Sequence, residues 1–218
     1  MNLSLAHVEL DRLFDIFNKK YFESKLEKPM IIIQSTGKKP IYGYCTMQKM
    51  WSNEDNSSGL YEMGISAEHL TRSVEDICGT LIHEMVHLYN KINDVKDVAP
   101  NYVYHNKRFK IEAEKRGLII TKAPQIGWSV TTLQDETKEF ISTLNVDQKV
   151  FSYYRVYYPK PKTINKYPQY KYVCPKCGEK ITSRNPELKI ICHACLVDDC
   201  DTEYPDLDYI FFERQNDE

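Results

Sequence analysis

Residues 83–87 read His83-Glu84-Met85-Val86-His87, an H-E-x-x-H motif inside a strongly apolar stretch of the chain. Four residues make about one turn of an α-helix, so the two histidines project from one face and can share a zinc ion. Glu84 points beside them, where its carboxylate can take a proton from water that the metal has acidified. The motif therefore predicts zinc-dependent hydrolysis with Glu84 as the general base.

The residues around the motif predict that it lies on a helix. Ser73 and Asp76 resemble a capping box, so the helix is expected to begin near Val74. Two histidines on a helix can also be ordinary hydrogen-bonded residues, so a metal site needs further ligands. Apolar residues recur at intervals of three and four, the spacing of a buried helix face: Val74, Ile77, Cys78, Leu81, Ile82, Met85, Val86 and Tyr89.

A third ligand has to come from elsewhere, because a catalytic zinc usually takes three protein ligands and leaves the fourth position for water. His105 is the next histidine, after seventeen intervening residues, and it lies where a polar loop meets a predicted helix over residues 106–116. Glu112 on that helix is the competing ligand. We favour His105, because an imidazole at the start of a helix that follows a loop reaches a metal easily, whereas the neighbours of Glu112 are those of a solvent-exposed helix face.

Size and composition indicate a globular chain of 218 residues, with 42% hydrophobic and 28% charged residues. No apolar run approaches the ~20 residues of a membrane span, and the amino terminus lacks the pattern of a signal peptide. Four of the seven cysteines form C-x-x-C pairs, an arrangement typical of metal ligands in a reducing compartment. We expect a cytoplasmic protein without a membrane partner.

Hydrophobic periodicity predicts an α+β fold in which helices pack on a small antiparallel sheet. An amphipathic helix is expected over residues 4–22, and residues 131–143 are weakly helical. Three strands close in sequence suggest an antiparallel meander beside the metal-binding helix, and an aromatic run suggests a further strand. The strand candidates are residues 30–33, 42–51, 60–66 and 151–158.

Two C-x-x-C units separated by fourteen residues predict a C-terminal zinc ribbon. Four thiolates close a tetrahedral site, so this zinc is expected to be structural, and it would help a short segment to fold. His193 and Cys200 are less well-spaced alternatives, and a disulfide is the competing interpretation. We expect a first domain at residues 1–148 and a second at 149–218, whose zinc ligands are Cys174, Cys177, Cys192 and Cys195.

Four stretches of the chain together resemble the SprT-like metalloproteases, which include the DNA-dependent protease Spartan of eukaryotes. The resemblance covers about residues 5–120 and continues into the ribbon. It implies a zincin-like fold, a protein substrate, His83, His87 and His105 as zinc ligands, and Glu84 as catalytic base. The chain departs from the pattern in a longer gap before His105 and in Tyr104, where a glycine is frequent. The stretches are residues 13–30, Gly43-Tyr44-Cys45, residues 80–87, and Tyr104-His105-Asn106-Lys107-Arg108-Phe109.

Charge is distributed unevenly in the C-terminal region. Residues 149–195 carry ten basic and two acidic side chains interleaved with tyrosines, and residues 196–218 carry one basic and nine acidic side chains. Basic groups neutralise phosphates and aromatic rings stack on bases, so single-stranded or distorted DNA is a candidate partner. The alternative is that the tyrosines and lysines of residues 149–195 form a half-buried strand, with the lysines on its solvent-exposed face. The acidic tail is expected to fold back and compete with nucleic acid.

The sequence thus predicts a zinc endopeptidase of SprT-like type with one catalytic and one structural zinc, and the resemblance implies DNA-bound or DNA-crosslinked proteins as its substrates. Two alternatives remain open. One is a zinc-ribbon nucleic-acid-binding protein of transcription or repair without protease activity. The other is a zinc hydrolase of a non-peptide amide, which the same residues would serve equally well.

Overall fold

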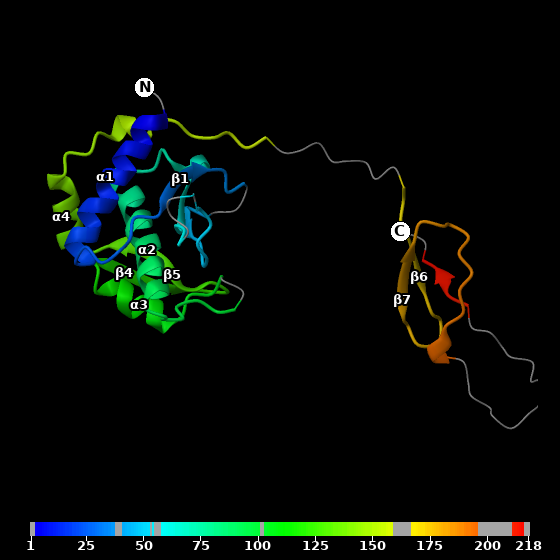
Figure 1. Cartoon of the computed structure of the whole chain (residues 1–218). Helices are drawn as coiled ribbons and strands as arrows, with labels where there is room; N and C mark the ends of the chain where they lie inside the picture. Colours follow the sequence, from blue (N-terminus) through cyan, green and yellow to red (C-terminus); the bar gives the residue numbers. More distant parts are fainter. Residues whose placement is uncertain are drawn as a thin grey trace, which may run out of the picture. The chain divides into compact units, whose positions relative to one another are not determined.

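The computed structural model describes residues 3–37, 41–52, 54, 58–100, 103–158, 167–195 and 211–215 (Figure 1). The chain divides into two units, Met1–Tyr158 and Pro159–Glu218. The first unit therefore continues to Tyr158, beyond the expected boundary at residue 148. No helix in these described ranges is both long enough and apolar enough to cross a membrane.

The first unit is built around α2 (Val74–Ile92), the helix that carries the H-E-x-x-H motif. Its predicted start is confirmed: Ser73 is the N-cap residue, and its Oγ accepts a hydrogen bond from Asp76 N at 3.1 Å. The amphipathic first helix is also confirmed as α1 (Leu3–Tyr21), whose buried face packs against the same core. Eleven residues of α2 are buried, so the helix is enclosed on most sides.

A three-stranded sheet covers one side of α2, and its topology differs from the predicted antiparallel meander. The strands β1 (Met30–Gln34), β2 (Gly43–Cys45) and β3 (Glu62–Ser66) lie in the order β1-β3-β2. β1 pairs with β3 in parallel, and only β2 and β3 are antiparallel. The most buried strand takes the central place, because Met63 and Ile65 are fully buried on the α2 side of β3.

A β-hairpin and two short helices complete the first unit: β4 (Leu118–Ala123), β5 (Gly127–Leu133), α3 (Lys107–Glu114) and α4 (Asp135–Thr143). The helix predicted near Asn106 is confirmed. The helical prediction for residues 131–133 was wrong, because these residues pair with β4, Leu133 opposite Leu118. The β-branched pair Thr131-Thr132 suits a strand, and the helix begins only at Asp135.

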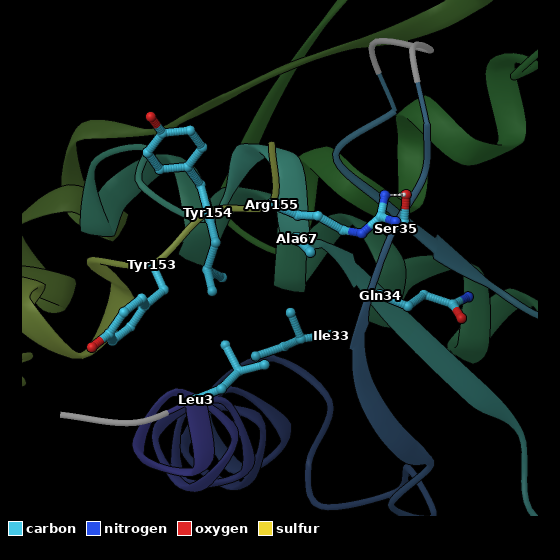
Figure 2. Close-up of a pocket in the computed structure, with 9 residues that line it drawn as sticks. Leu3, Ile33, Gln34, Ser35, Ala67, Tyr153, Tyr154 and Arg155 are labelled. Atoms are coloured by element: carbon cyan, nitrogen blue, oxygen red, sulfur yellow. Dashed lines mark hydrogen bonds between the residues drawn. The ribbon is translucent and has the colours of Figure 1, made fainter. Parts of the chain in front are cut away.

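The aromatic strand predicted at residues 151–158 is not present. A 3₁₀ turn, η2 (Gln148–Phe151), buries the Phe151 ring in the core, and residues 152–158 have no regular secondary structure. Arg155 fixes this segment to the first unit: its N donates to Ala67 O at 2.9 Å and its guanidinium to Ser35 Oγ at 2.7 Å. The segment borders a pocket of about 640 Å³ beside Leu3 and Ile33 (Figure 2).

The second unit is a small three-stranded sheet, β6 (Tyr170–Val173), β7 (Lys180–Ser183) and β8 (Glu213–Arg214), in the order β7-β6-β8. A 3₁₀ turn, η3 (His193–Cys195), follows β7 in the chain and carries Cys195. The His193 side chain, Cys200 and the acidic run at residues 198–208 lie outside the described residues. Among the described residues of this unit, five buried side chains form the core: Tyr172, Cys174, Cys192, Cys195 and Phe212.

Candidate metal centres

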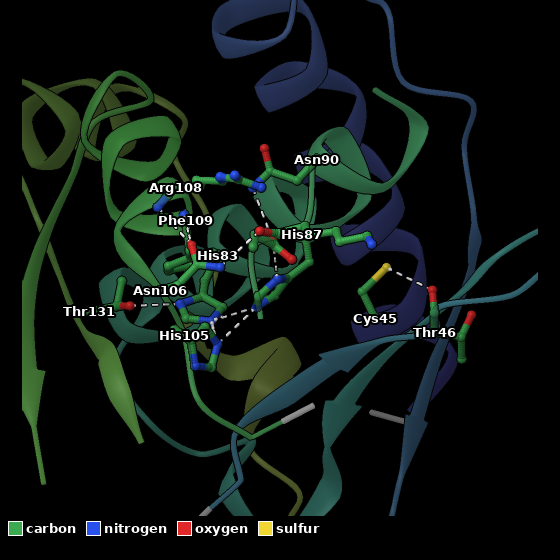
Figure 3. A network of polar contacts seen from close by, with 12 residues as sticks. Cys45, Thr46, His83, His87, Asn90, His105, Asn106, Arg108, Phe109 and Thr131 are labelled. Carbon is green, nitrogen blue, oxygen red and sulfur yellow. Dashed lines mark hydrogen bonds and ion pairs between the residues drawn. The ribbon is translucent and has the colours of Figure 1, made fainter. Parts of the chain in front are cut away.

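Three imidazoles, two from α2 and one from the residues just before α3, converge on one point (Figure 3). The distances between Nε2 atoms are 3.2 Å for His83 and His87, 3.3 Å for His83 and His105, and 3.0 Å for His87 and His105. Tetrahedral zinc with Zn–N bonds of about 2.0–2.1 Å places its ligand nitrogens about 3.3–3.4 Å apart. The donor atoms and their spacing therefore fit a zinc ion.

His105 reaches the cluster because two backbone hydrogen bonds hold it against β5. His105 N donates to Ile126 O, and Trp128 N donates to His105 O, both at 3.0 Å. This close approach requires glycine at position 127, where φ is +70° and a Cβ atom would lie 2.2 Å from His105 O. The pairing explains how a histidine eighteen residues after His87 returns to the metal-binding face of α2.

Glu112, the competing candidate ligand, lies outside the histidine cluster. Its carboxylate forms ion pairs with Lys115 and Arg116, each at 2.7 Å. Burial favours the neutral form of Glu112, but the hydrogen bonds from these two cations outweigh it and lower the pKa of the carboxyl group. The carboxylate already has its partners at the C-terminal end of α3, and the structure brings His105 to the other two histidines instead.

The carboxylate of Glu84 lies beside the cluster, between α2 and strand β2. Glu84 is only 5% exposed. A Cβ atom at Gly43 would lie 3.0 Å from both Cγ and Oε1 of Glu84, so the carboxylate rests directly against the β2 backbone. Burial raises the pKa of Glu84 to about 7, although the nearby His87 acts in the opposite direction. A carboxyl group with this pKa can both accept and release a proton near neutral pH.

The aromatic ring of Phe109 packs against all three histidines. Its ring centroid lies 4.5 Å from those of His83 and His87 and 4.8 Å from that of His105. Burial lowers the pKa of His83 well below its usual value and that of His105 to about 4. Both imidazoles are therefore neutral at physiological pH, which is the form that binds a metal.

The four cysteines of the second unit, Cys174, Cys177, Cys192 and Cys195, form the other cluster, with equally suitable spacing. The sulfur atoms of Cys174 and Cys195, and those of Cys177 and Cys192, are 3.6 Å apart. Tetrahedral zinc with Zn–S bonds of about 2.3 Å places its sulfurs about 3.8 Å apart. The backbone amides of Cys177 and Lys176 lower the pKa of Cys174 to about 6, which favours the thiolate.

Two polar partners of the histidines carry no recognisable sequence signal. His87 Nδ1 lies 2.7 Å from Asp97 Oδ2, and His83 Nδ1 lies 2.7 Å from Thr131 Oγ1. These pairs are separated by 10 and 48 residues in the sequence. Neither partner belongs to the H-E-x-x-H motif, so only the tertiary contacts show them.

The fold and its clusters define a mixed α+β protein with two candidate zinc-binding centres, one of histidines beside a carboxylate and one of cysteines. The SprT-like family model matches residues 10–126, which are 117 of the 218 residues, so the chain belongs to the SprT-like family. This family is associated with a metallopeptidase-like domain. A search of curated proteins finds no match to the chain.

Proposed function

We propose that this protein is a zinc-dependent endopeptidase in which His83, His87 and His105 hold the catalytic zinc and Glu84 is the general base. The observation that carries the proposal is the buried Glu84 carboxylate beside three converging Nε2 atoms. A zinc ion held there would polarise a carbonyl group and lower the pKa of water. Cys174, Cys177, Cys192 and Cys195 would hold the second, structural zinc.

Glu84 moves the proton in this proposal. Its carboxylate accepts a proton from the attacking water and delivers it to the leaving amine of the cleaved peptide bond. Burial raises the pKa of Glu84, so its carboxylate is a stronger base than a solvated one. Burial against Gly43 fixes the carboxylate and keeps bulk water away from it.

The free edge of β2 supports a polypeptide substrate over a small amide. Tyr42 O accepts from Ser66 N, and Thr46 N donates to Glu62 O, so these alternate residues face β3. Gly43 and Cys45 therefore direct their backbone N–H and C=O groups away from β3. Among the described residues no strand pairs with this edge. An extended peptide can add to it as a further strand that runs past Glu84.

Substitution of Glu84 by Gln tests the catalytic assignment. The neutral amide cannot accept a proton, so we expect cleavage of an unfolded protein substrate to fall by about 10²–10⁴-fold. Zinc content should stay at two ions per chain, because Glu84 is not a ligand in the proposal. Glu75→Gln, an exposed position on the same helix, is the matched control and should cleave normally.

Each alternative function predicts a different result. Equal cleavage by Glu84→Gln and the unsubstituted protein would contradict the general-base role. A purely nucleic-acid-binding protein would cleave no protein at all. A hydrolase of non-peptide amides would turn over small amides while leaving extended polypeptides intact, so both substrate classes belong in the assay.

DNA association is the second proposed property, and basic and aromatic side chains of the ribbon sheet support it. The Arg214 guanidinium lies 4.1 Å from the Tyr170 ring centroid, and the ring of Tyr167 is 64% exposed. Stacking rings with adjacent cations suit unpaired bases and phosphates. We propose single-stranded or distorted DNA as the partner and DNA-bound or DNA-crosslinked proteins as the substrates. We also propose a cytoplasmic location, where the six described cysteines would stay reduced.

Two exposed cations of the ribbon offer the test: Lys171 on β6, and Arg184, whose guanidinium lies 5.7 Å from the Tyr167 ring centroid. Both are changed together, as Lys171→Gln and Arg184→Gln. We expect weaker binding to single-stranded DNA and a smaller dependence of the affinity on salt, because two phosphate contacts are lost. Lys138→Gln, an exposed lysine of α4 in the first unit, is the control for loss of charge. If the affinity for single-stranded DNA and its dependence on salt are unchanged, these ribbon residues do not bind DNA. Cleavage of a DNA-bound protein with and without single-stranded DNA then measures activation.

A further inference from the structure

Asp97 contacts one of the three candidate zinc ligands with its side chain and lies beside another through its backbone. It is only 2% exposed and follows α2 in the loop that leads to α3. Its Oδ2 atom lies 2.7 Å from His87 Nδ1 and accepts a hydrogen bond from Asn90 Nδ2 at 3.0 Å. Its backbone O accepts a hydrogen bond from Asn106 N at 2.9 Å, next to His105.

The side-chain contact determines which nitrogen of His87 faces the cluster. A carboxylate can only accept, so the proton of the neutral imidazole lies on Nδ1 and the lone pair on Nε2. Nε2 is the atom that points towards His83 and His105. A carboxylate behind a metal-binding imidazole also makes its free nitrogen a stronger electron donor.

His83 has a neutral partner in the equivalent place. Thr131 Oγ1 lies 2.7 Å from His83 Nδ1, and the same hydroxyl donates to Ser129 O at 3.3 Å. Because its hydrogen is used for Ser129, the hydroxyl oxygen accepts from His83 Nδ1. Both histidines thus present Nε2 to the cluster, but only His87 has a buried negative charge behind it.

The backbone of Asp97 closes the loop that delivers His105. Besides the bond from Asn106, Ala99 N donates to Tyr104 O at 2.8 Å, and Val98 forms an antiparallel bridge with His105. Residues 97–99 therefore pair with residues 104–106 in a short ladder of backbone contacts that includes the third histidine. A movement of Asp97 would disturb His87 and His105 together.

We propose that Asp97 is a positioning residue of the zinc site, which fixes the tautomer and orientation of His87 and anchors the loop that carries His105. Thr131 has the same orienting role for His83 without the charge. The proposal rests on the zinc site of the proposed function but not on peptidase activity. It therefore concerns zinc affinity, which can be measured without a substrate.

Zinc affinity of the full-length protein, measured by competition with a chromophoric chelator, tests the proposal. For Asp97→Ala we expect the affinity of one zinc to fall about 10–100-fold. Asp97→Asn should lose less, because the amide oxygen still accepts the hydrogen bond from Nδ1 while the charge is gone. The cysteine-bound zinc should keep its affinity in both variants and provides an internal reference. Asp94→Asn is the matched control: Asp94 is exposed in the same loop, and asparagine tolerates its φ of 54°.

A second readout separates positioning from ordinary stabilisation. With Co²⁺ in place of zinc, a changed ligand orientation should alter the visible absorption bands in Asp97→Ala and leave them unaltered in Asp94→Asn. If Asp97→Ala does not fold, Asp97→Asn carries the test alone. Zinc affinity of Asp97→Asn within twofold of the unsubstituted protein, together with unaltered bands, would overturn the proposal.

Failure of the proposed function would look different. If Glu84→Gln cleaves normally while Asp97→Asn weakens zinc binding, the peptidase mechanism is wrong and the positioning role stands. If Glu84→Gln is inactive and Asp97→Asn binds zinc normally, the positioning role is wrong and the mechanism stands.

Discussion

The absence of a side chain at Gly43 determines where the proposed general base can lie, and Gly43→Ala tests this directly. The added Cβ would lie 2.8 Å from Thr80 Cγ2 and 3.0 Å from Glu84 Cγ and Oε1. Ordinary carbon contacts are about 3.5–4.0 Å, so these groups must separate by at least about 0.5–0.7 Å. Thr80 cannot easily rotate away, because its Oγ1 donates to Asp76 O and accepts from Arg72, both at 2.9 Å.

The strain therefore falls on Glu84 or on strand β2. Overpacking of this kind costs about 1–3 kcal/mol of folding stability. A catalytic group displaced by a large fraction of an ångström loses about 10–100-fold in rate. The three atoms nearest to the new methyl group belong to Thr80 and Glu84, and none belongs to a histidine. We thus expect a lower melting temperature and a lower kcat, with two zinc ions still bound.

The assay combines cleavage of an unfolded protein substrate, zinc analysis and thermal unfolding. Gly79→Ala is the matched control, because its Cβ would meet Leu133 at 3.5 and 3.7 Å, which are ordinary contacts. Gly79 lies within α2, where alanine is more favourable than glycine by about 1 kcal/mol, so this variant should be active and no less stable. Unchanged kcat and melting temperature in Gly43→Ala would refute the close approach of β2 to Glu84.

Two further predictions concern protons and metal. In the metal-free protein, stability should fall as the pH is lowered from 6.5 to about 4, because the unfolded chain protonates His105 in this window while burial keeps the folded imidazole neutral. Urea unfolding at a series of pH values should show this fall, and His105→Asn should make it shallower; an identical slope would contradict the assignment. Cys177→Ser should reduce bound zinc from two ions to one and open residues 167–195 to trypsin, since the five side chains buried in the described part of the ribbon make too small a core without the metal. The melting temperature of the first unit should stay unchanged, and trypsin resistance of the ribbon would show that its zinc is dispensable.

The main helix and the motif on it could be predicted from the sequence because their causes are local. The spacing of Val74 to Tyr89 encodes one buried face, and the Ser73 hydroxyl satisfies a free backbone N–H group at the helix start. Positions 83 and 87 then share a face through helix geometry alone. The two C-x-x-C units are local in the same way, since each places two thiols on one turn.

Strand order could not be predicted, because it depends on contacts between distant residues. Met63 and Ile65 are buried against α2, and this places β3 between β1 and β2 although it follows both in the chain. The spacing of apolar residues over Thr131 to Leu133 does not distinguish a helix from a strand, because the segment is so short. Only the pairing with residues 118–120 makes them a strand.

The sequence by itself thus determined the helix, the pair of histidines with Glu84 between them, and the four thiols. It left the third ligand open between His105 and Glu112. The tertiary structure decided which of the two lies at the cluster, because backbone hydrogen bonds with Ile126 and Trp128 hold His105 at the cluster, while Lys115 and Arg116 pair with Glu112 at the end of its helix. It also placed Asp97 behind His87, since hydrogen bonds made by a buried loop depend on how the chain returns to its own core.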